Sequence, residues 1–238
     1  MNGFNINISA SAAWAPGLDD AAAWRAWPGK TLPLDDGSAP DIRFIDALLR
    51  RRLGRLSRMA LHVANRVAAE WISLPTVFAS RHGELSRTVS MLHALAAETS
   101  PSPAAFSLSV HNSAAGIFSI VRGDHAPSTA LAAGDETLLW ALLDATARLT
   151  DDPDSAILLV YADEPLATEY QSYSSASASA HALALLLRPG EGIHLEWTEN
   201  RVRAPTPEPL SLTLLTHLLG QREKLTWHGE RLSVDIHA

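Results

Sequence analysis

Cysteine is absent from the 238 residues of this chain. A protein without cysteine can form no disulfide bond, no thiolate nucleophile and no zinc site with sulfur ligands. Catalysis by a thiol is therefore excluded, whichever fold the chain adopts. The absence leaves the cellular compartment open, so other features of the sequence have to indicate it.

Positive charge is also scarce, because 19 lysine and arginine residues stand against 26 aspartate and glutamate residues. A nucleic-acid-binding protein normally carries an excess of cations to meet phosphates. The most apolar uncharged stretch, residues 104–121, contains serine, histidine and asparagine, which makes it too polar to span a membrane. No lysine or arginine precedes Arg25, unlike the charged start of a secretory signal. We expect a cytoplasmic protein that does not bind nucleic acid and does not span a membrane.

Familiar cofactor and metal motifs are missing as well. Neither GxGxxG nor GxxxxGK occurs, and the ten histidines show none of the paired spacings that hold a metal ion. We therefore expect no cofactor and no metal site. Asp124, His125 and Ser128 supply the residue types of a hydrolase triad, but triad members usually converge from distant segments. With no GxSxG turn to expose a serine, a polar turn is the favoured interpretation, and a hydrolase remains the weaker alternative.

What the sequence does contain is an alternation of strand and helix patterns. Apolar runs predict strands over residues 5–9, 75–79, 156–161, 181–188, 193–198 and 225–236. Amphipathic spacing predicts helices over residues 20–27, 47–70, 84–97, 136–149 and 210–219, and residues 106–121 are compatible with a helix. Strands and helices alternate as far as about residue 160, and strands predominate after it. This order predicts an α/β fold with a mixed sheet.

A run of arginines marks the first part of the long predicted helix. It comprises Arg50, Arg51, Arg52, Arg55 and Arg58. Such a run most often faces solvent, and the functional interpretation is a docking site for an acidic partner, which complementary charge would steer.

Several segments resemble the β-ketoacyl synthase family and occur in the family's order. They are Phe106-Ser107-Leu108-Ser109-Val110-His111-Asn112, then Ala115-Gly116, then Ser128-Thr129-Ala130-Leu131-Ala132-Ala133-Gly134. In the family, an asparagine and a small-residue helix precede a strand that ends in Ser-Thr-Ala-Cys-x-x-Gly. Segments 52–60, 77–84 and 182–188 fit as well, so the likeness covers roughly residues 45 to 188, in several blocks.

The resemblance places Leu131 where the family has its nucleophilic cysteine. A cysteine at a helix N-terminus is held as a thiolate and carries the acyl chain, whereas leucine can neither ionise nor attack. The family's two catalytic histidines lie in a C-terminal half that we expect this chain to lack. Inactive relatives of this kind are the chain length factors of type II polyketide systems. The Trp-, Pro- and Gly-rich stretch near the N-terminus resembles the short forms found in aryl polyene clusters.

The resemblance also implies a fold and a partner. We expect a thiolase-like half, with a mixed sheet and helices on both faces, over residues 1–188. A short α+β extension, residues 189–238, is expected to pack on the same domain. A lone half would leave apolar surface uncovered, and uncovered surface of this kind marks an interface. The implied partner is a full-length ketosynthase subunit.

By the same resemblance, the chain is a non-catalytic subunit that shapes the acyl-chain tunnel of that ketosynthase. The complex of the two subunits would be a β-ketoacyl synthase. The tunnel or gate residues are expected to be Phe106, Phe118 and Leu131, and the dimer seam is expected to include Phe106, Leu108, Val110 and Asn112. The five arginines are the expected contact for an acyl carrier protein. The alternative from another class is a homodimeric module that binds a small molecule or an acyl chain.

Overall fold

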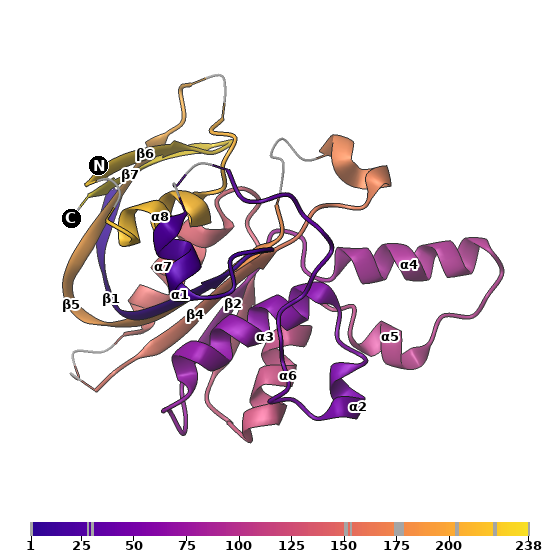
Figure 1. The fold of residues 1–238 in the computed structure, drawn as a ribbon. Helices are drawn as coiled ribbons and strands as arrows, with labels where there is room; N and C mark the ends of the chain where they lie inside the picture. The colour runs from indigo at the N-terminus through magenta and orange to yellow at the C-terminus, as the bar shows by residue number, and fades with distance from the viewer. Residues whose placement is uncertain are drawn as a thin grey trace.

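The computed structural model describes residues 2–27, 29, 31–149, 152, 154–173, 179–202, 205–220 and 223–237. Its centre is a seven-stranded mixed sheet in the order β3-β2-β4-β5-β7-β6, with β1 paired to β5 (Figure 1). Strand β2 is parallel to β3 and β4, and the other pairings are antiparallel. The strands are β1 Asn2–Trp14, β2 Thr76–Ala79, β3 Ser128–Leu131, β4 Ile157–Asp163, β5 His181–Glu199, β6 Lys224–His228 and β7 Leu232–His237.

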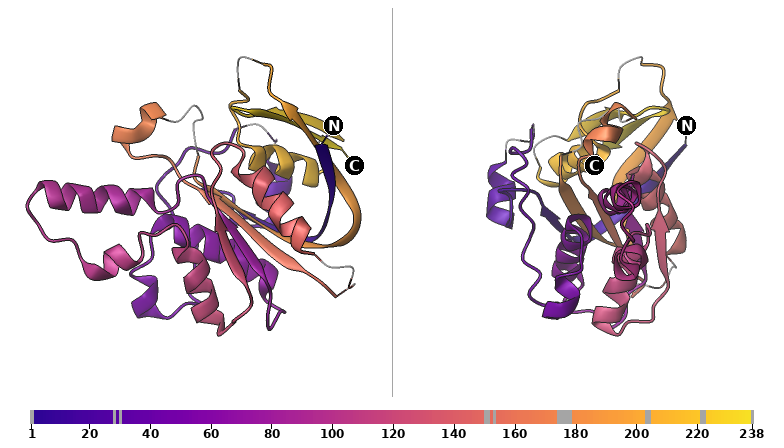
Figure 2. Two further views of the ribbon diagram at one scale, coloured as in Figure 1. Left: turned by 180° about the vertical axis from the view of Figure 1, so that it is seen from behind. Right: turned by 90° about the vertical axis from the view of Figure 1, so that its right-hand side faces the viewer.

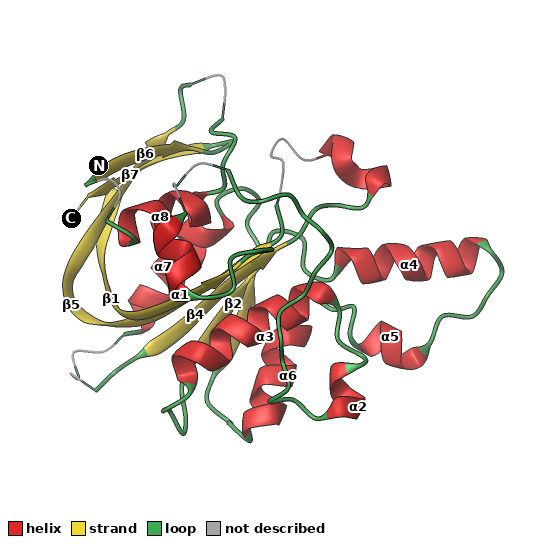
Figure 3. Ribbon diagram, viewed as in Figure 1, coloured by secondary structure: helices red, strands yellow, loops and turns green. Residues whose placement is uncertain are grey.

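Helices pack on both faces of this sheet, as Figures 2 and 3 allow the reader to follow. They are α1 Ala21–Ala26, α2 Ala47–Arg50, α3 Arg55–Ala68, α4 Leu85–Ala96, α5 Pro103–Ser107, α6 Ser113–Arg122, α7 Thr137–Arg148 and α8 Leu210–Leu218, with a 3₁₀ turn at Thr168–Tyr173. Helices α3 and α6 contribute to the core on one face, and α7 and α8 to the core on the other. The α4–α5 hairpin projects from the body of the molecule (Figure 1).

The apolar run of β4 explains why two cores can form on one sheet. Side chains alternate between the faces of a strand, so a strand covered on both sides needs apolar residues at every position. Leu158 and Val160 face the α3 and α6 core, while Ile157 and Leu159 face the α7 and α8 core. Every residue of β4 is buried.

Strand β5 joins the two parts of the sheet. Its first half pairs with β4 and its second half pairs with β7, while β1 runs along its other edge. The pairing with β1 jumps from Ile193 to Arg188, so the intervening residues form a bulge. Gly192 lies in this bulge, where a Cβ atom would meet the carbonyl oxygen of Ile6 at 2.2 Å. The bulge thus lets the single strand β5 pair with β4 in one half of the sheet and with β7 in the other half.

The sequence-based boundaries differ from the structure in several elements. The strand expected over 5–9 is longer, because β1 runs over Asn2–Trp14. The expected helix over 47–70 is divided between α2 and α3, and the expected helical stretch over 106–121 is divided between α5 and α6. The two strands expected over 181–188 and 193–198 are one strand, β5, which runs through the expected domain boundary at 188/189. The strand expected over 225–236 is a hairpin of β6 and β7, because the chain turns between His228 and Leu232.

None of the helices in the described ranges is both long and apolar enough to cross a membrane.

Candidate functional site

The carboxyl ends of β2, β3 and β4 meet at one edge of the sheet, where ligand sites of parallel sheets usually form. Arg81, which follows β2, directs Nη1 to Oδ1 of Asp135 at 3.0 Å, and its Nε lies 3.9 Å from Oδ2 of Asp163. The Arg81 side chain is only 5% exposed. An ion pair this deeply buried fixes the loop that contains Asp135 against the ends of β2 and β4.

Asp163 lies at the centre of this group of polar residues at the ends of β2 and β4. Its Oδ1 accepts hydrogen bonds from the backbone N–H of Arg81 at 2.9 Å and from the Ser80 hydroxyl at 3.1 Å. Its Oδ2 accepts from the Tyr161 hydroxyl at 2.5 Å. Burial raises the pKa of the Tyr161 phenol well above its usual value, so this group stays a neutral donor. The hydroxyls therefore act as hydrogen-bond donors to one carboxylate, an arrangement that stabilises structure.

A second polar pair links β5 to α8. His181 Nε2 lies 2.6 Å from the Ser211 hydroxyl, and its Nδ1 lies 2.7 Å from the carbonyl oxygen of Ser179. A histidine beside a serine hydroxyl is an element of hydrolase sites, but both residues are almost completely buried. Burial lowers the pKa of His181, which keeps the ring neutral. The pair joins two elements of the fold in a place that the described residues shield from solvent.

Neither polar group was predicted from the sequence. Arg81 and Asp163 could have been found, because each comes at the end of a predicted buried strand and parallel strands bring such ends together. No sequence signal joins His181 to Ser211, which lie 30 positions apart.

Leu131, at the expected position of the nucleophile, is the last residue of β3. Its carbonyl oxygen accepts a hydrogen bond from the backbone N–H of Ser80, and its side chain packs partly buried against the α7 and α8 core. The turn that follows uses Gly134 at φ +63°, and the Thr137 hydroxyl ties it to the start of α7. Leu131 thus lies on a strand, and not at the N-terminus of α7, which begins at Thr137.

The expected gate and seam residues lie in different environments. Phe106 on α5 is 67% exposed, and Val110 and Asn112 are exposed as well. Phe118 on α6 is only 3% exposed and packs against Phe78, with ring centroids 5.7 Å apart.

Leu108 is partly buried against the same core as Phe118, whereas Leu131 packs against the core on the opposite face of the sheet. The structure therefore separates the three expected gate residues, and it leaves Phe106 and Val110 free to contact another chain.

The arginine run does not form a stripe on one helix. Arg55 forms an ion pair with Asp35 at 2.5 Å, and Arg58 donates to the carbonyl oxygens of Leu53 and Arg50. Arg55 thus ties the start of α3 to the segment around Asp35, and Arg58 holds the α2–α3 junction together. Two others of the run, Arg51 and Arg52, have exposed side chains that can meet an acidic partner.

Of the residues with hydrolase-triad chemistry, Asp124 and His125 lie in the loop between α6 and β3, and Ser128 is the first residue of β3. The Asp124 carboxylate accepts hydrogen bonds from the Ser73 hydroxyl at 3.0 Å and from the backbone N–H groups of Leu74 and Ala126. The Ser128 hydroxyl accepts from Thr76 at 2.8 Å, while His125 is exposed. Asp124 thus anchors the segment before β2, and the favoured interpretation as a polar turn agrees with its contacts.

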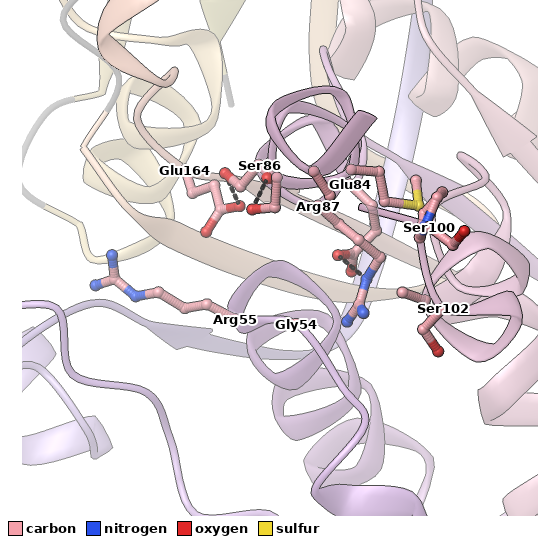
Figure 4. A pocket seen from close by; sticks show the side chains of 13 residues that line it. Gly54, Arg55, Glu84, Ser86, Arg87, Ser100, Ser102 and Glu164 are labelled. Atoms are coloured by element: carbon pink, nitrogen blue, oxygen red, sulfur yellow. Dashed lines mark hydrogen bonds and ion pairs between the residues drawn. The ribbon is translucent and has the colours of Figure 1, made fainter. Parts of the chain in front are cut away.

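An open cavity of about 460 Å³ lies between the start of α3 and the α4–α5 hairpin (Figure 4). Residues of α3, α4, α5 and the segment after β4 line it, and its walls mix apolar with charged side chains. Its lining includes none of the expected gate residues.

Comparison with known proteins places the chain in a family. The model of the β-ketoacyl synthase N-terminal domain matches residues 24–234. The chain belongs to the β-ketoacyl synthase family. No curated protein has a sequence that matches this chain.

Solved structures of this family have a fold similar to that of this chain. A ketosynthase (ApeO) in complex with its chain length factor (ApeC), from Xenorhabdus doucetiae, matches with a TM-score of 0.85 and 26% identity, over 99% of this chain and 100% of that chain. The ishigamide ketosynthase/chain length factor matches with a TM-score of 0.57 and 18% identity, over 83% of this chain and 68% of that chain. The expected thiolase-like, ketosynthase-type fold and the resemblance to chain length factors are confirmed.

Proposed function

We propose that this chain is a non-catalytic, chain-length-factor-like subunit that pairs with an active ketosynthase. In that complex it shapes the tunnel for the growing acyl chain, in the cytoplasm, in a type II polyketide pathway of the aryl polyene kind. The observation that carries the proposal is the end-to-end match to a chain of a structure that contains a ketosynthase and its chain length factor.

The chemistry at the end of β3 supports a non-catalytic role. Leu131 offers no nucleophile, and no cysteine exists elsewhere in the sequence to replace it. The neighbouring polar groups are engaged with one another, since Asp163 accepts from Ser80, Arg81 and Tyr161. Condensation would therefore depend on the nucleophile of the partner.

Strand β3 offers a place for that partner. Within the described residues it pairs only with β2, so its other edge presents unpaired backbone groups. The exposed Phe106 and Val110 supply apolar side chains of the kind that another chain buries. We propose that β3 and the segment from Phe106 to Asn112 form the seam with the ketosynthase. The exposed Arg51 and Arg52 are proposed to meet the acyl carrier protein.

Co-expression with the ketosynthases of the source organism tests this function. We expect size-exclusion chromatography with light scattering to show a one-to-one complex with one of them, and condensing activity only when both subunits are present. Condensation by this chain alone would overturn the non-catalytic assignment. A stable self-dimer that ignores every ketosynthase would instead favour the homodimeric binding module.

A further inference from the structure

The cavity beside the α4–α5 hairpin combines an apolar wall with a carboxylate at one end. Its volume of about 460 Å³ lies within the range of small-molecule sites. Figure 4 shows Glu164 and Ser86 together at one end of the cavity. The residues of the apolar wall are Met91, Ala94, Pro101 and Ala105. Such a wall suits an organic molecule with a hydrocarbon part rather than a bare ion.

Glu164 brings a negative charge to this end of the cavity. Arg55, which also lines the cavity, forms its ion pair with Asp35 at 2.5 Å. Arg87, another lining residue, lies 3.5 Å from Oε2 of Glu84. Among the described residues, no ion pair joins Glu164 to an arginine or a lysine. Burial raises the pKa of Glu164, as expected for a carboxylate without a contacting cation. A cationic group is therefore favoured at this end, and an anionic group is disfavoured.

Two serine hydroxyls on α4 add acceptors beside this carboxylate. Ser86 donates its hydroxyl hydrogen to Oε1 of Glu164 at 2.8 Å, and Ser90 donates its own to the backbone carbonyl oxygen of Ser86 at 2.9 Å. A hydroxyl has one hydrogen and two lone pairs, so both serine oxygens are left as acceptors. Ser86 and Ser90 are four positions apart on one helix, so they share a face, and both line the cavity. Together with the carboxylate, they give this end three side chains that accept hydrogen bonds.

We propose that this cavity binds a primary ammonium group on an aliphatic stem, with the ammonium at the end formed by Glu164, Ser86 and Ser90. An ammonium group has three N–H donors and no acceptor, which matches the three accepting side chains. Its charge compensates Glu164, and its stem packs against the apolar wall. A carboxylate or a phosphate brings more negative charge, and a hydroxyl brings one donor without charge. This site goes beyond the proposed function, because it uses residues of this chain alone.

Binding of short probes to the purified chain at pH 7 tests the ammonium site. The probes are hexylammonium, hexyltrimethylammonium, 1-hexanol and hexanoate, which share the stem and differ in the polar end. In a nuclear magnetic resonance titration, we expect hexylammonium to bind about tenfold tighter than 1-hexanol, because its hydrogen bond to the carboxylate is charge-assisted. Hexyltrimethylammonium keeps the charge without an N–H donor and should bind more weakly than hexylammonium, and hexanoate should bind most weakly. No binding of hexylammonium, or equal binding of any other probe, would overturn the assignment.

Three variants locate the binding. Glu164→Gln keeps the size of the side chain and removes its charge, so it should weaken hexylammonium about tenfold and leave 1-hexanol unchanged. Ser90→Ala removes one acceptor and should weaken hexylammonium by a smaller factor. Ala94→Trp should fill the cavity and abolish the binding of both probes. The matched control is Glu70→Gln, because Glu70 is exposed and does not line the cavity. Hexylammonium that binds Glu164→Gln as tightly as wild type would place the site elsewhere.

Free amines and lysine side chains both carry a primary ammonium group, and the complex with a ketosynthase distinguishes these two sources. If a lysine of the ketosynthase fills the cavity, the complex no longer binds hexylammonium, and Glu164→Gln weakens the complex. If a free amine is bound, the complex binds hexylammonium as tightly as the isolated chain does. A wild-type chain that pairs with a ketosynthase but prefers 1-hexanol would refute the ammonium site and leave the proposed function standing. A chain that binds hexylammonium but pairs with no ketosynthase would do the reverse.

Discussion

The carboxylate of Glu84 caps helix α3 from 27 positions away in the sequence, through Ser57. Its Oε1 accepts hydrogen bonds from the Ser57 backbone N–H at 3.2 Å and from the Ser57 hydroxyl at 2.5 Å. The N-cap residue of α3, Gly54, provides no side chain for this purpose, and a Cβ atom there would lie 2.4 Å from Oε2 of Glu84. A negative charge at a helix N-terminus also interacts favourably with the helix dipole.

Replacing Glu84 should therefore destabilise the fold. Glu84→Ala removes the cap and breaks the ion pair with Arg87, so we expect a loss of about 2 kcal/mol in the free energy of unfolding. For a chain of this length, that loss lowers the Tm by about 4–8 °C in a calorimetric scan. Glu84→Gln keeps an acceptor and should lose less. Glu70→Ala, at an exposed site, is the control, and a loss there equal to that of Glu84→Ala would contradict the capping role.

Phe106 and Phe118 should respond differently to truncation. Phe118→Ala leaves a void against Phe78 in the core, which should cost about 3–5 kcal/mol in denaturant unfolding. Phe106→Ala removes an exposed side chain and should leave the stability of the isolated chain within about 0.5 kcal/mol of wild type. If Phe106 lies at the seam or the gate as proposed, its loss weakens the complex or lengthens the products. Leu34→Ala, at another exposed position, is the matched control.

The buried ion pair of Arg81 should be costly to break. Arg81→Met leaves Asp135 and Asp163 without their cation, and we expect a loss of about 3–5 kcal/mol in denaturant unfolding. Hydrogen exchange should rise in the peptide that spans residues 132–136, because this loop loses its anchor. Arg43→Met breaks an exposed ion pair with Asp41 and should cost less than about 1 kcal/mol. Unchanged exchange in the loop would show that Arg81 does not hold it.

Sequence patterns predicted the helices and strands that form through interactions between residues close together in the chain. Neighbouring residues form the continuous apolar run of β4 and the amphipathic face of α3. Both elements were therefore expected near their observed positions. The division between α2 and α3 was not expected, because the cap on α3 comes from Glu84, a residue remote in sequence. The single strand β5 was not expected either, since its continuity past Gly190 depends on the pairing with β1.

The same distinction applies to the candidate site. The block around Leu131 could be identified from residue order alone, because the family motif is contiguous. The cavity joins the start of α3, the α4–α5 hairpin and Glu164, which the fold assembles from separate segments. Burial also had to come from the structure, since Phe106 and Phe118 are alike as residues but one is exposed and the other lies in the core.

The stability of the chain should fall as the pH drops below about 6.5, because of His181. Burial lowers the pKa of His181 in the folded protein, so the unfolded chain takes up a proton at a pH where the folded chain does not. Unfolding then becomes more favourable as the pH falls. The contribution of His181 to stability is fully present at pH values above the pKa that this histidine has in the unfolded chain. His82 contributes in the same direction, because burial lowers its pKa as well. In denaturant unfolding between pH 5 and pH 8, His181→Gln should flatten the dependence, whereas the exposed control His125→Gln should leave it unchanged. An unaltered pH dependence in His181→Gln would assign the effect to other groups.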